Sequence, residues 1–385
     1  MRSSFKIARI AGIEIGIHYT WLFAFALIAW SLAVGFFPST FGGFDAATYW
    51  LLGIAGALGL FVSVLVHELS HSLVALARGM KVHSITLFIF GGVSNLQGEA
   101  EEPKDEFLVS VVGPVSSFIL AILFWALQRP FSTTVSPIGA VLGYLAFVNL
   151  MLGAFNLVPG FPLDGGRVLR SLVWGATGSM RRATQVASYA GQAVAFLLIF
   201  WGLSRMFGGD FLGGLWTAFI GWFLNNAAES TRQQQIIEEH LRGIRVTQVM
   251  DPQPPVVAPG LSVHDFVFDH VLQRGERAVL VSQAGRLAGI ASITDAKRVP
   301  QSAWSSTPVG QIMTRAPLRT VPATADLSVA LKLLTESSLH QAPVLDDDGT
   351  VLGMLTRADI LRFLQYRDEV GLRGAAKQDV APRPV

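Results

Sequence analysis

Two imidazoles and a carboxylate lie within five residues of the chain, in the segment His67-Glu68-Leu69-Ser70-His71. On a helix, positions i and i+4 lie on one face, so both imidazoles can reach the same metal ion. Glu68 lies one position further round, where its side chain can take a proton from a metal-bound water. Because the chain contains no cysteine, a transition metal must be bound by His, Asp or Glu. The spacing therefore predicts a zinc site, with one ion per chain and Glu68 as general base.

A second polar segment offers a third metal ligand, Asp164. A catalytic zinc ion usually has three protein ligands and one open position. Residues 156–166 read Asn-Leu-Val-Pro-Gly-Phe-Pro-Leu-Asp-Gly-Gly, and prolines and glycines at this density end a regular helix. Irregular backbone at membrane depth requires protein or a water cavity around it. We therefore expect Asp164 to join His67 and His71, and a turn-capping role is the alternative.

The composition indicates that these residues belong to a membrane protein. Of the 385 residues, 51% are hydrophobic and 15% are charged, whereas soluble proteins have about 25% charged residues. Ionisable groups in a membrane helix are functional by default. The net charge of +2 is too small to indicate nucleic-acid binding. Since a spanning helix needs roughly 17–25 mainly apolar residues, we predict six spans: Tyr19–Phe37, Ala47–Leu76, Phe107–Leu127, Ile138–Val158, Val186–Met206 and Phe211–Ala227.

The distribution of Lys and Arg predicts how the chain crosses the membrane, because cytoplasmic loops carry an excess of these residues. Basic residues are numerous before the first predicted span, in every second connection and after the last span, namely Arg2, Lys6, Arg9, Arg78, Lys81, Lys104, Arg167, Arg170, Arg181, Arg182 and Arg232. The other connections hold only Arg129 and Arg205. We therefore expect a multi-pass protein of the cell membrane with both termini in the cytoplasm. This orientation puts Asp164 on the same side as His67 and His71.

The two polar segments together resemble the site-2 protease family of intramembrane zinc metalloproteases, peptidase family M50. The resemblance rests on His67–His71, on the Asn-x-x-Pro-x-x-Pro-Leu-Asp-Gly-Gly segment and on Gly12–Trp21 before the first span. It covers about residues 8–225. It implies that His67, His71 and Asp164 are zinc ligands and that Glu68 is the base. It also implies regulated intramembrane proteolysis of a membrane protein, such as a membrane-bound transcription factor or an anti-sigma factor.

The resemblance gives a role to Asn156 as well. It implies that this amide lies near the zinc and holds the scissile carbonyl or its oxyanion, and a helix-end hydrogen bond is the alternative. The family often has an asparagine a few residues after Gly-Pro in its third helix. This chain has Gly113-Pro114-Val115-Ser116-Ser117 there, which leaves the role of Ser116 and Ser117 open. We expect His18 and His83 to make interface contacts.

Two short strands around a glycine turn follow the predicted metal-binding helix. Residues Val82–Phe90 and Val93–Leu96 have strand composition and flank Gly91-Gly92. In the family, such a segment offers a strand edge. A helical peptide bond is shielded, so an unwound substrate can pair with this edge without a sequence requirement. The resemblance assigns Gly91, Gly92 and Val93 to a substrate-binding strand, and a simple re-entrant or interfacial hairpin is the alternative.

An internal repeat occupies the more polar residues 244–366. Val246-Thr247-Gln248-Val249-Met250 matches Val309-Gly310-Gln311-Ile312-Met313 at an offset of 63, and Gly289 matches Gly353 at 64. Each copy then reads as a helix, two strands and a final helix. The repeat resembles a tandem pair of cystathionine-β-synthase (CBS) domains, about 244–300 and 307–366.

Each copy also carries a Ser/Thr-x-x-Asp motif, which is similar to the ribose-binding motif of CBS domains. The motifs are Ser292-Ile293-Thr294-Asp295 and Thr356-Arg357-Ala358-Asp359. An Asp at a helix start can accept hydrogen bonds from both ribose hydroxyls, and a helix N-terminus favours phosphate. The resemblance implies that ATP, ADP or AMP binds at Ser292, Asp295, Thr356 and Asp359 and regulates the protein. A purely structural pair, or one that forms a homodimer, is the alternative.

The predicted fold class is a multi-pass α-helical membrane domain with six transmembrane helices and a small β-hairpin, followed by a soluble α/β tandem CBS domain. We expect the membrane domain over residues 1–228, a linker over 229–243, the CBS pair over 244–366 and a flexible tail over 367–385. Two other functions remain open: a CBS-regulated channel or transporter, and a catalytically silent binding protein. The H-E-x-x-H register argues against the first, and the intact Glu68 argues against the second.

Overall fold

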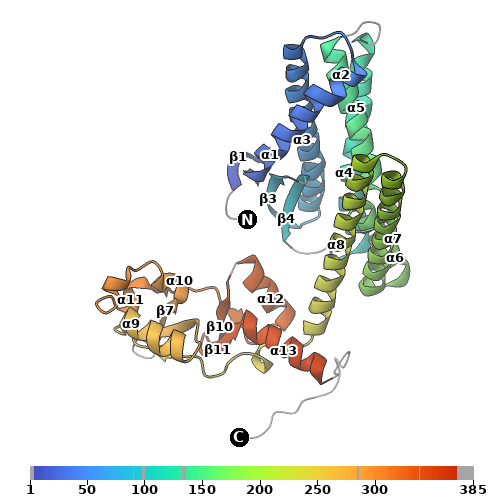
Figure 1. Cartoon of the computed structure of the whole chain (residues 1–385). Helices are drawn as coiled ribbons and strands as arrows, with labels where there is room; N and C mark the ends of the chain where they lie inside the picture. Colours follow the sequence, from blue (N-terminus) through green and yellow to red (C-terminus); the bar gives the residue numbers. More distant parts are fainter. Residues whose placement is uncertain are drawn as a thin grey trace. The chain divides into compact units, whose positions relative to one another are not determined.

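The computed structural model describes residues 4–89, 91–97, 100–131, 136–283, 286–337 and 339–370 (Figure 1). The chain divides into two compact units, Met1–Gln234 and Gln235–Val385. The first holds the long apolar helices and one small sheet, and the second holds the repeat. Each unit has hydrophobic clusters of its own.

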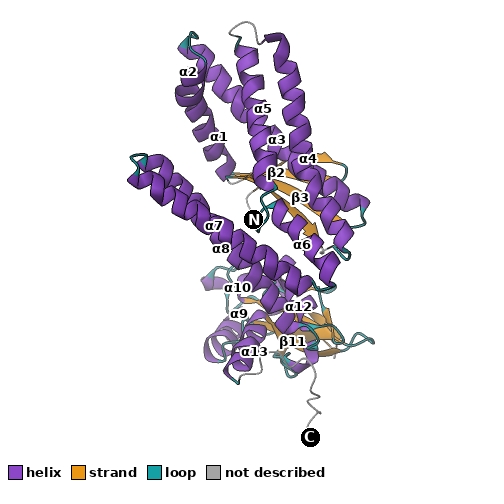
Figure 2. Cartoon of the chain, turned by 90° about the vertical axis from the view of Figure 1, so that its right-hand side faces the viewer, coloured by secondary structure: helices purple, strands orange, loops and turns teal. Residues whose placement is uncertain are grey.

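Long helices dominate the first unit (Figure 2). Helix α1 continues through a π-helical turn, Leu32–Phe36, into the short α2. The bounds are α1 Thr20–Ser31, α2 Phe37–Thr40, α3 Ala46–Ala77, α4 Pro103–Gln128, α5 Pro137–Asn156, α6 Asp164–Thr177, α7 Met180–Phe207 and α8 Phe211–Leu241.

Five segments of the described residues are long and apolar enough to cross a membrane. They are Thr20–Thr40, Ala46–Ala77, Pro103–Phe131, Pro137–Asn156 and Met180–Phe207. Many of their apolar side chains point outward, for example Phe200, Leu197 and Ile122, as expected for helices that contact lipid. The prediction of an apolar helical half is thus confirmed. The sixth span, Phe211–Ala227, stays a prediction, and its residues form the first part of α8.

Helix α3, which carries the H-E-x-x-H segment, has clear signals at both ends. Its N-cap residue Asp45 accepts a hydrogen bond from the backbone N–H of Thr48 at 3.0 Å, which satisfies one of the free donors of the first turn. At the other end, Gly79 has a φ of 81°, a left-handed conformation that favours glycine and stops the helix. The buried residues Ala57 and Phe61 of α3 face the neighbouring helices. These contacts fix the helix that presents both histidines.

A four-stranded sheet, ordered β1-β2-β3-β4, lies in the first unit. Strands β3 and β4 pair antiparallel and form the predicted hairpin. The sequence pattern missed the other two strands, of which β2 pairs parallel with β3. The predicted glycine turn is also shifted, because Gly91 and Gly92 already belong to β4 and pair with β3. The bounds are β1 Ser4–Ile10, β2 Ile13–His18, β3 Lys81–Phe88 and β4 Gly91–Gln97.

The second unit contains the two copies of the repeat and two sheets, and strand β8 of the second copy joins the sheet of the first copy. The sheets have the strand orders β5-β6-β7-β8 and β11-β10-β9. The hairpins β6–β7 and β10–β11 pair in equivalent register, since Ala278 faces Ser292 and Gln341 faces Thr356. The strands are β5 Val256–Val257, β6 Ala278–Gln283, β7 Arg286–Ser292, β8 Thr314–Arg315, β9 Val321–Pro322, β10 Gln341–Leu345 and β11 Val351–Thr356.

Short helices complete each copy of the repeat. They are α9 Val263–Asp265 with the π-helix Phe266–Gln273, α10 Ile293–Ala296, α11 Val309–Ile312, α12 Leu327–Glu336 and α13 Arg357–Glu369. Within the segments expected to be linker and tail, α8 continues to Leu241 and α13 to Glu369. Residues 371–385 of the predicted tail lie outside the described residues.

Candidate active site

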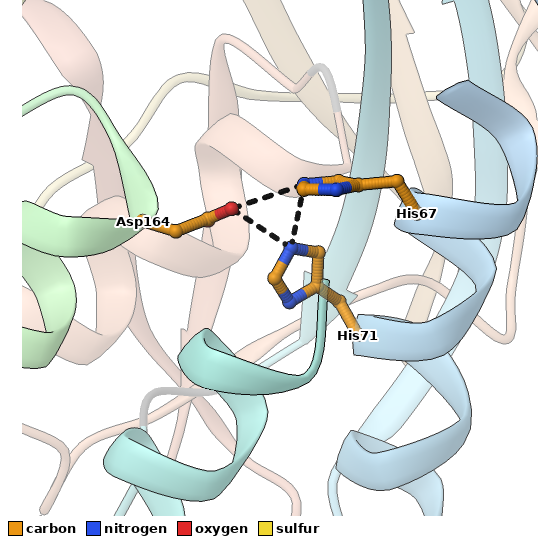
Figure 3. Close-up of side chains that lie close together, drawn as sticks. All are labelled: His67, His71 and Asp164. Atoms are coloured by element: carbon orange, nitrogen blue, oxygen red, sulfur yellow. Dashed lines mark hydrogen bonds and ion pairs between the residues drawn. The ribbon is translucent and has the colours of Figure 1, made fainter. Parts of the chain in front are cut away.

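His67 and His71 lie on successive turns of α3 and point toward Asp164, the first residue of α6 (Figure 3). Oδ2 of Asp164 lies 3.0 Å from Nε2 of His67 and 3.1 Å from Nε2 of His71. The two Nε2 atoms are 3.2 Å apart. Both histidines are buried, and Asp164 is partly buried. Three donor atoms from elements far apart in the sequence thus form a small triangle.

The size of this triangle fits a zinc ion. Zinc bonds to imidazole nitrogen and carboxylate oxygen measure about 2.0–2.2 Å, so adjacent donors of a tetrahedral site lie roughly 3.3 Å apart. The three observed separations of 3.0, 3.1 and 3.2 Å are close to that value. Two imidazoles and one carboxylate also form a donor set that catalytic zinc uses, with one position left for water or substrate.

Groups of helix α4 form hydrogen bonds with Nδ1, the second ring nitrogen, of each histidine. Nδ1 of His71 donates to the backbone carbonyl of Val109 at 2.5 Å, and Nδ1 of His67 pairs with the hydroxyl of Ser117 at 2.9 Å. Because a carbonyl can only accept, the Val109 bond keeps a proton on Nδ1 of His71 and leaves its Nε2 free to bind a metal. The hydroxyl of Ser117 can accept the Nδ1 proton of His67 in the same way. Ser117 belongs to the segment where the family often has asparagine, so its hydroxyl provides a polar partner at that point of the helix.

Gly113 of α4 lies directly against the two imidazoles. A Cβ atom at this position would lie 2.8 Å from Nε2 of His67 and closer still to Nε2 of His71. Contacts under 3.0 Å essentially never occur for real Cβ atoms. Only glycine therefore lets α4 approach the donor triangle this closely. Val109, Gly113 and Ser117 recur at helical spacing, so one face of α4 makes all of these contacts.

A buried ion pair joins α6, which begins at Asp164, to α4. Nε of Arg170 donates to Oε1 of Glu106 at 2.6 Å, and Nε of Arg167 lies 4.0 Å from the same oxygen. Glu106 is fully buried, and a buried charge is tolerated only when it is paired. Asp164, Arg167 and Arg170 follow one another at three-residue spacing and so share one side of α6. The pair thus helps to set the direction of Asp164.

The glycines after Asp164 allow α6 to start against the irregular segment before it. A Cβ atom at Gly165 would collide with the backbone of residues 157–158, and one at Gly166 with the backbone of residues 160–161. Pro159 and Pro162 keep this segment from continuing α5 as a helix. In the Leu-Asp-Gly-Gly sequence, the two glycines are therefore needed for packing, and the aspartate is the candidate metal ligand.

Glu68 lies beside strand β4 rather than in the donor triangle. A Cβ atom at Gly92 would lie 3.0 Å from Cδ of Glu68 and closer to its Cγ. Strand β4 is held against α3 by a hydrogen bond between the hydroxyls of Ser72 and Ser94, at 2.6 Å. It stands at one edge of the sheet and, within the described residues, pairs with β3 alone. The carboxylate therefore neighbours a strand edge that can accept another strand.

The other residues singled out in the first unit lie outside the donor triangle. The amide nitrogen of Asn156 donates to the carbonyl of Leu152 at 3.0 Å, within α5. His18 pairs with the hydroxyl of Thr20 at 2.9 Å, and His83 is exposed on β3. The hydroxyl of Ser116 donates to the carbonyl of Gly113. The role of Asn156 stays a prediction.

In each Ser/Thr-x-x-Asp motif of the second unit, the Asp carboxylate accepts hydrogen bonds from the Ser or Thr of the same motif. Oδ2 of Asp295 accepts from the backbone N–H and the hydroxyl of Ser292, at 3.0 and 2.7 Å. Oδ2 of Asp359 accepts from the same two groups of Thr356, at 3.1 and 2.6 Å. The first motif also lines a cavity of about 610 Å³ between the two copies. The second motif is not among the residues that line this cavity.

Sequence reasoning missed the contacts of Val109 and Gly113 of α4 with the histidines and left the role of Ser117 open. The contacts of Val109, Gly113 and Ser117 join residues that are 38 to 50 positions away from the histidines, and no local pattern encodes them. A signal was nevertheless present, because Glu106 begins an otherwise apolar span and Gly113 interrupts it at the same helical spacing. A charged residue at the start of a membrane span usually pairs with another buried polar or charged group.

Comparisons with known proteins identify the family to which the chain belongs. Residues 55–135 and 132–199 match the model of Peptidase family M50, and residues 309–366 match the CBS domain. Rip3 of Mycobacterium tuberculosis is 38% identical over 375 residues, which cover 95% of this chain and 94% of that protein. Zinc metalloprotease MJ0392 of Methanocaldococcus jannaschii is 30% identical over 296 residues, which cover 76% and 79%.

A solved structure, the site-2 protease from Methanocaldococcus jannaschii, is also similar. It has a TM-score of 0.41 and 29% identity, and the match covers 60% of this chain and 95% of that chain. The family itself is established by the near full-length similarity to Rip3. The chain belongs to peptidase family M50. The predicted class, a membrane metalloprotease followed by CBS domains, is therefore confirmed.

Proposed function

We propose that the chain is an intramembrane protease whose zinc ion is held by His67, His71 and Asp164. The observation that carries this proposal is the donor triangle, with sides of 3.0 to 3.2 Å. When bound, zinc supplies a Lewis acid that polarises a carbonyl and lowers the pKa of water to about 7. The bonds from Val109 and Ser117 to the histidines support this role, because ligand histidines usually have such partners.

Glu68 is the general base of the proposed reaction. It lies one residue after His67, outside the donor triangle and beside Gly92. Its carboxylate takes a proton from the attacking water while the water oxygen bonds to the peptide carbon. The same proton then passes to the amide nitrogen as the C–N bond breaks, which releases an amine and a carboxylate. Proton transfer of this kind typically contributes 10²–10⁴-fold to the rate.

The edge of β4 is the proposed substrate-binding strand, with Gly91, Gly92 and Val93 at its start. An extended substrate that pairs with this edge passes next to Glu68, because Gly92 contacts that side chain. Main-chain pairing gives affinity with little demand on sequence. Asn156, at the end of α5, is proposed to hold the scissile carbonyl or its oxyanion. The substrates would be membrane proteins, such as membrane-bound transcription factors or anti-sigma factors.

We further propose a multi-pass protein of the cell membrane with both termini in the cytoplasm. The five apolar helices and the bias of Lys and Arg toward alternate connections support this topology. The proposed division is a membrane domain over 1–228, a linker over 229–243 and a CBS pair over 244–366. The CBS pair would bind an adenine nucleotide that regulates cleavage, and it offers a surface for a homodimer.

The decisive experiment compares Glu68→Gln with the double variant His67→Ala/His71→Ala in purified full-length protein. We expect about one zinc per chain in wild type and in Glu68→Gln, and none in the double variant. Cleavage of an unstructured probe protein, β-casein, should fall by about 10²-fold or more in Glu68→Gln. Exposed Glu101 provides the matched control, since Glu101→Gln should change neither zinc nor cleavage.

Two outcomes would contradict the proposal. Full zinc occupancy in the double variant would show that the metal binds elsewhere. Near-normal cleavage by Glu68→Gln would remove Glu68 from the reaction. Cleavage products that disappear from the membranes of cells carrying Glu68→Gln would, in the same experiment series, identify natural substrates.

A further inference from the structure

Strand β1, at the start of the chain, carries exposed apolar side chains that the proposed protease reaction does not use. Phe5 is 72% exposed, Ile7 58% and Ile10 41%. The strand lies at the opposite edge of the sheet from β4 and, within the described residues, pairs with β2 alone. Exposed apolar groups that gather in one place indicate a surface that a partner covers.

The pairing of β1 with β2 shows which way these side chains point. Directly opposite residues of an antiparallel pair have their side chains on the same face. Phe5 faces Ile17, and Ile10 faces Ile13. Ile13 is fully buried in a cluster with Ala75 of α3. Phe5 and Ile10 therefore extend the apolar face of the sheet beyond the part that the helices cover.

The other face of β1 is basic. Lys6 faces Gly16, and Arg9 faces Glu14. Nζ of Lys6 lies 2.7 Å from Oε2 of Glu14, but both side chains are well exposed, so this ion pair contributes little and can exchange. Nε of Arg9 donates to the carbonyl of Gly12 at 3.2 Å. A guanidinium has five N–H donors, so Arg9 can bind an anion while it keeps this bond.

Strand β1 also lies close to the level at which the chain enters the membrane. The first apolar span, Thr20–Thr40, has 21 residues and measures about 32 Å, which matches the hydrocarbon layer. Only Tyr19 separates this span from His18, the last residue of β2, and His18 faces Ser4 of β1. Two Cα steps and one strand spacing amount to about 13 Å. The strand therefore begins beside the headgroup layer.

The first turn of α1 has the same kind of surface as β1. Leu22 and Phe23 are exposed apolar residues of this turn, and they face lipid if α1 crosses the membrane. Tyr19, just before the helix, is 60% exposed, and an aromatic residue at this place is typical of the membrane–water interface. The apolar face of β1 thus continues a surface that is suited to lipid.

Two features of β1 argue against a second copy of the chain as the partner. The register of β1 shifts between Lys6 and Ala8, so Ile7 forms a bulge, and a bulge on an edge strand hinders pairing with another strand. Lys6 hinders it further, because a lysine on an edge strand brings like charges together when two such edges meet. A lipid surface has neither requirement.

We propose that β1 anchors the sheet to anionic lipid, with Phe5, Ile7 and Ile10 at the boundary of the acyl chains and Lys6 and Arg9 on the phosphates of the headgroups. This inference goes beyond the protease reaction and rests only on the membrane location of α1. Strands β1 to β4 form one sheet. The anchor therefore also holds the sheet whose far edge is the proposed substrate-binding strand.

Fluorescence quenching tests the location of β1. The chain contains no cysteine, so full-length Ile7→Cys can be labelled with bimane at that position alone. In vesicles of phosphatidylcholine and phosphatidylglycerol, lipids with a nitroxide near the headgroup should quench this label strongly, and iodide in the water should quench it weakly. Leu22→Cys is the lipid-facing control, and exposed Ser302→Cys is the water-facing control. Phe5→Cys provides a second label position on the strand.

The double variant Lys6→Gln/Arg9→Gln, added to Ile7→Cys, tests the anionic headgroups. The nitroxide is placed on one lipid or the other in equal mixtures. We expect phosphatidylglycerol to be enriched about fivefold around the label, since two basic residues opposed by Glu14 leave one net positive charge. The double variant, or high salt, should abolish this preference. Lys332→Gln/Arg315→Gln in the second unit, the matched control, should retain it.

Three results would overturn the inference. The first is strong quenching of the label by iodide together with weak quenching by lipid. The second is equal quenching by the two lipids at low salt when Lys6 and Arg9 are intact. The third is protection from both quenchers that disappears at low protein-to-lipid ratio, which would identify a second copy of the chain as the partner. Zinc content and melting temperature equal to those of wild type show that each labelled variant is folded.

Discussion

In the first unit, the donor triangle joins His67 to Asp164 across 97 positions of the chain, and α4 contacts both histidines from a third place. In the second unit, Asp295 and Ser292 form their hydrogen bonds across three positions. The metal centre therefore depends on how helices pack, whereas each CBS motif is complete within one turn. Substitutions far from the proposed zinc ligands should disturb the first kind of site, and substitutions far from Asp295 should leave its motif intact.

Gly113→Ala should give the largest effect of a residue that is neither ligand nor base. The new Cβ atom would lie 2.8 Å from Nε2 of His67 and closer to His71, so α4 or both imidazoles must move. We expect loss of zinc and at least a 10²-fold loss of cleavage, measured by metal analysis and by the casein assay. Gly175→Ala in α6 is the control, since its nearest neighbour would lie at 3.7 Å. Normal zinc content in Gly113→Ala would contradict the dependence on packing.

Glu106→Gln should have the second-largest effect on zinc affinity, because Glu106 holds α6, the helix that carries Asp164, in position. The substitution leaves Arg170 buried without its anionic partner, and breaking such a pair costs about 3–5 kcal/mol of stability. We expect a lower melting temperature and zinc affinity reduced about 10–100-fold in chelator competition. Exposed Glu102→Gln should leave both quantities unchanged.

A double variant separates the ion pair from simple misfolding. Glu106→Leu together with Arg170→Met replaces the pair by apolar side chains of similar size, which is often neutral for stability. If melting temperature recovers while zinc affinity stays low, the pair positions Asp164. Full recovery of zinc affinity would instead assign Glu106 to folding alone.

Ser117→Ala should produce the smallest of these effects. It removes the partner of Nδ1 of His67, a bond of 2.9 Å, and leaves the three donor atoms in place. We expect zinc affinity to fall about tenfold, at the lower end of the range for such residues. Ser116→Ala is the matched control, because its hydroxyl bonds only to the backbone of Gly113 among the contacts described for it. Equal effects of both variants would remove the special role of Ser117.

The same contrast explains what the sequence could predict. The H-E-x-x-H and Leu-Asp-Gly-Gly segments, the apolar spans and the repeat are local patterns, and they led to the family and the fold class. The pairing of β2 with β3 and the ion pair of Glu106 with Arg170 join distant segments. Strand β1 is exposed from Phe5 to Ile10, so no buried face fixes its register and its pairing depends on the neighbouring strand β2. Such features follow from packing rather than from periodicity.

The length of α3 has a consequence for the depth at which peptide bonds are cut. The helix has 32 residues and so measures about 48 Å, at about 1.5 Å per residue. His67 follows Ala46 by 21 residues, or about 32 Å, which equals roughly the thickness of the hydrocarbon layer. With the first turn of α3 at one surface of that layer, the proposed zinc ligands would lie at the opposite surface. Hydrolysis consumes a water molecule in every turnover, and at this depth the water can enter from the adjacent aqueous phase without crossing lipid.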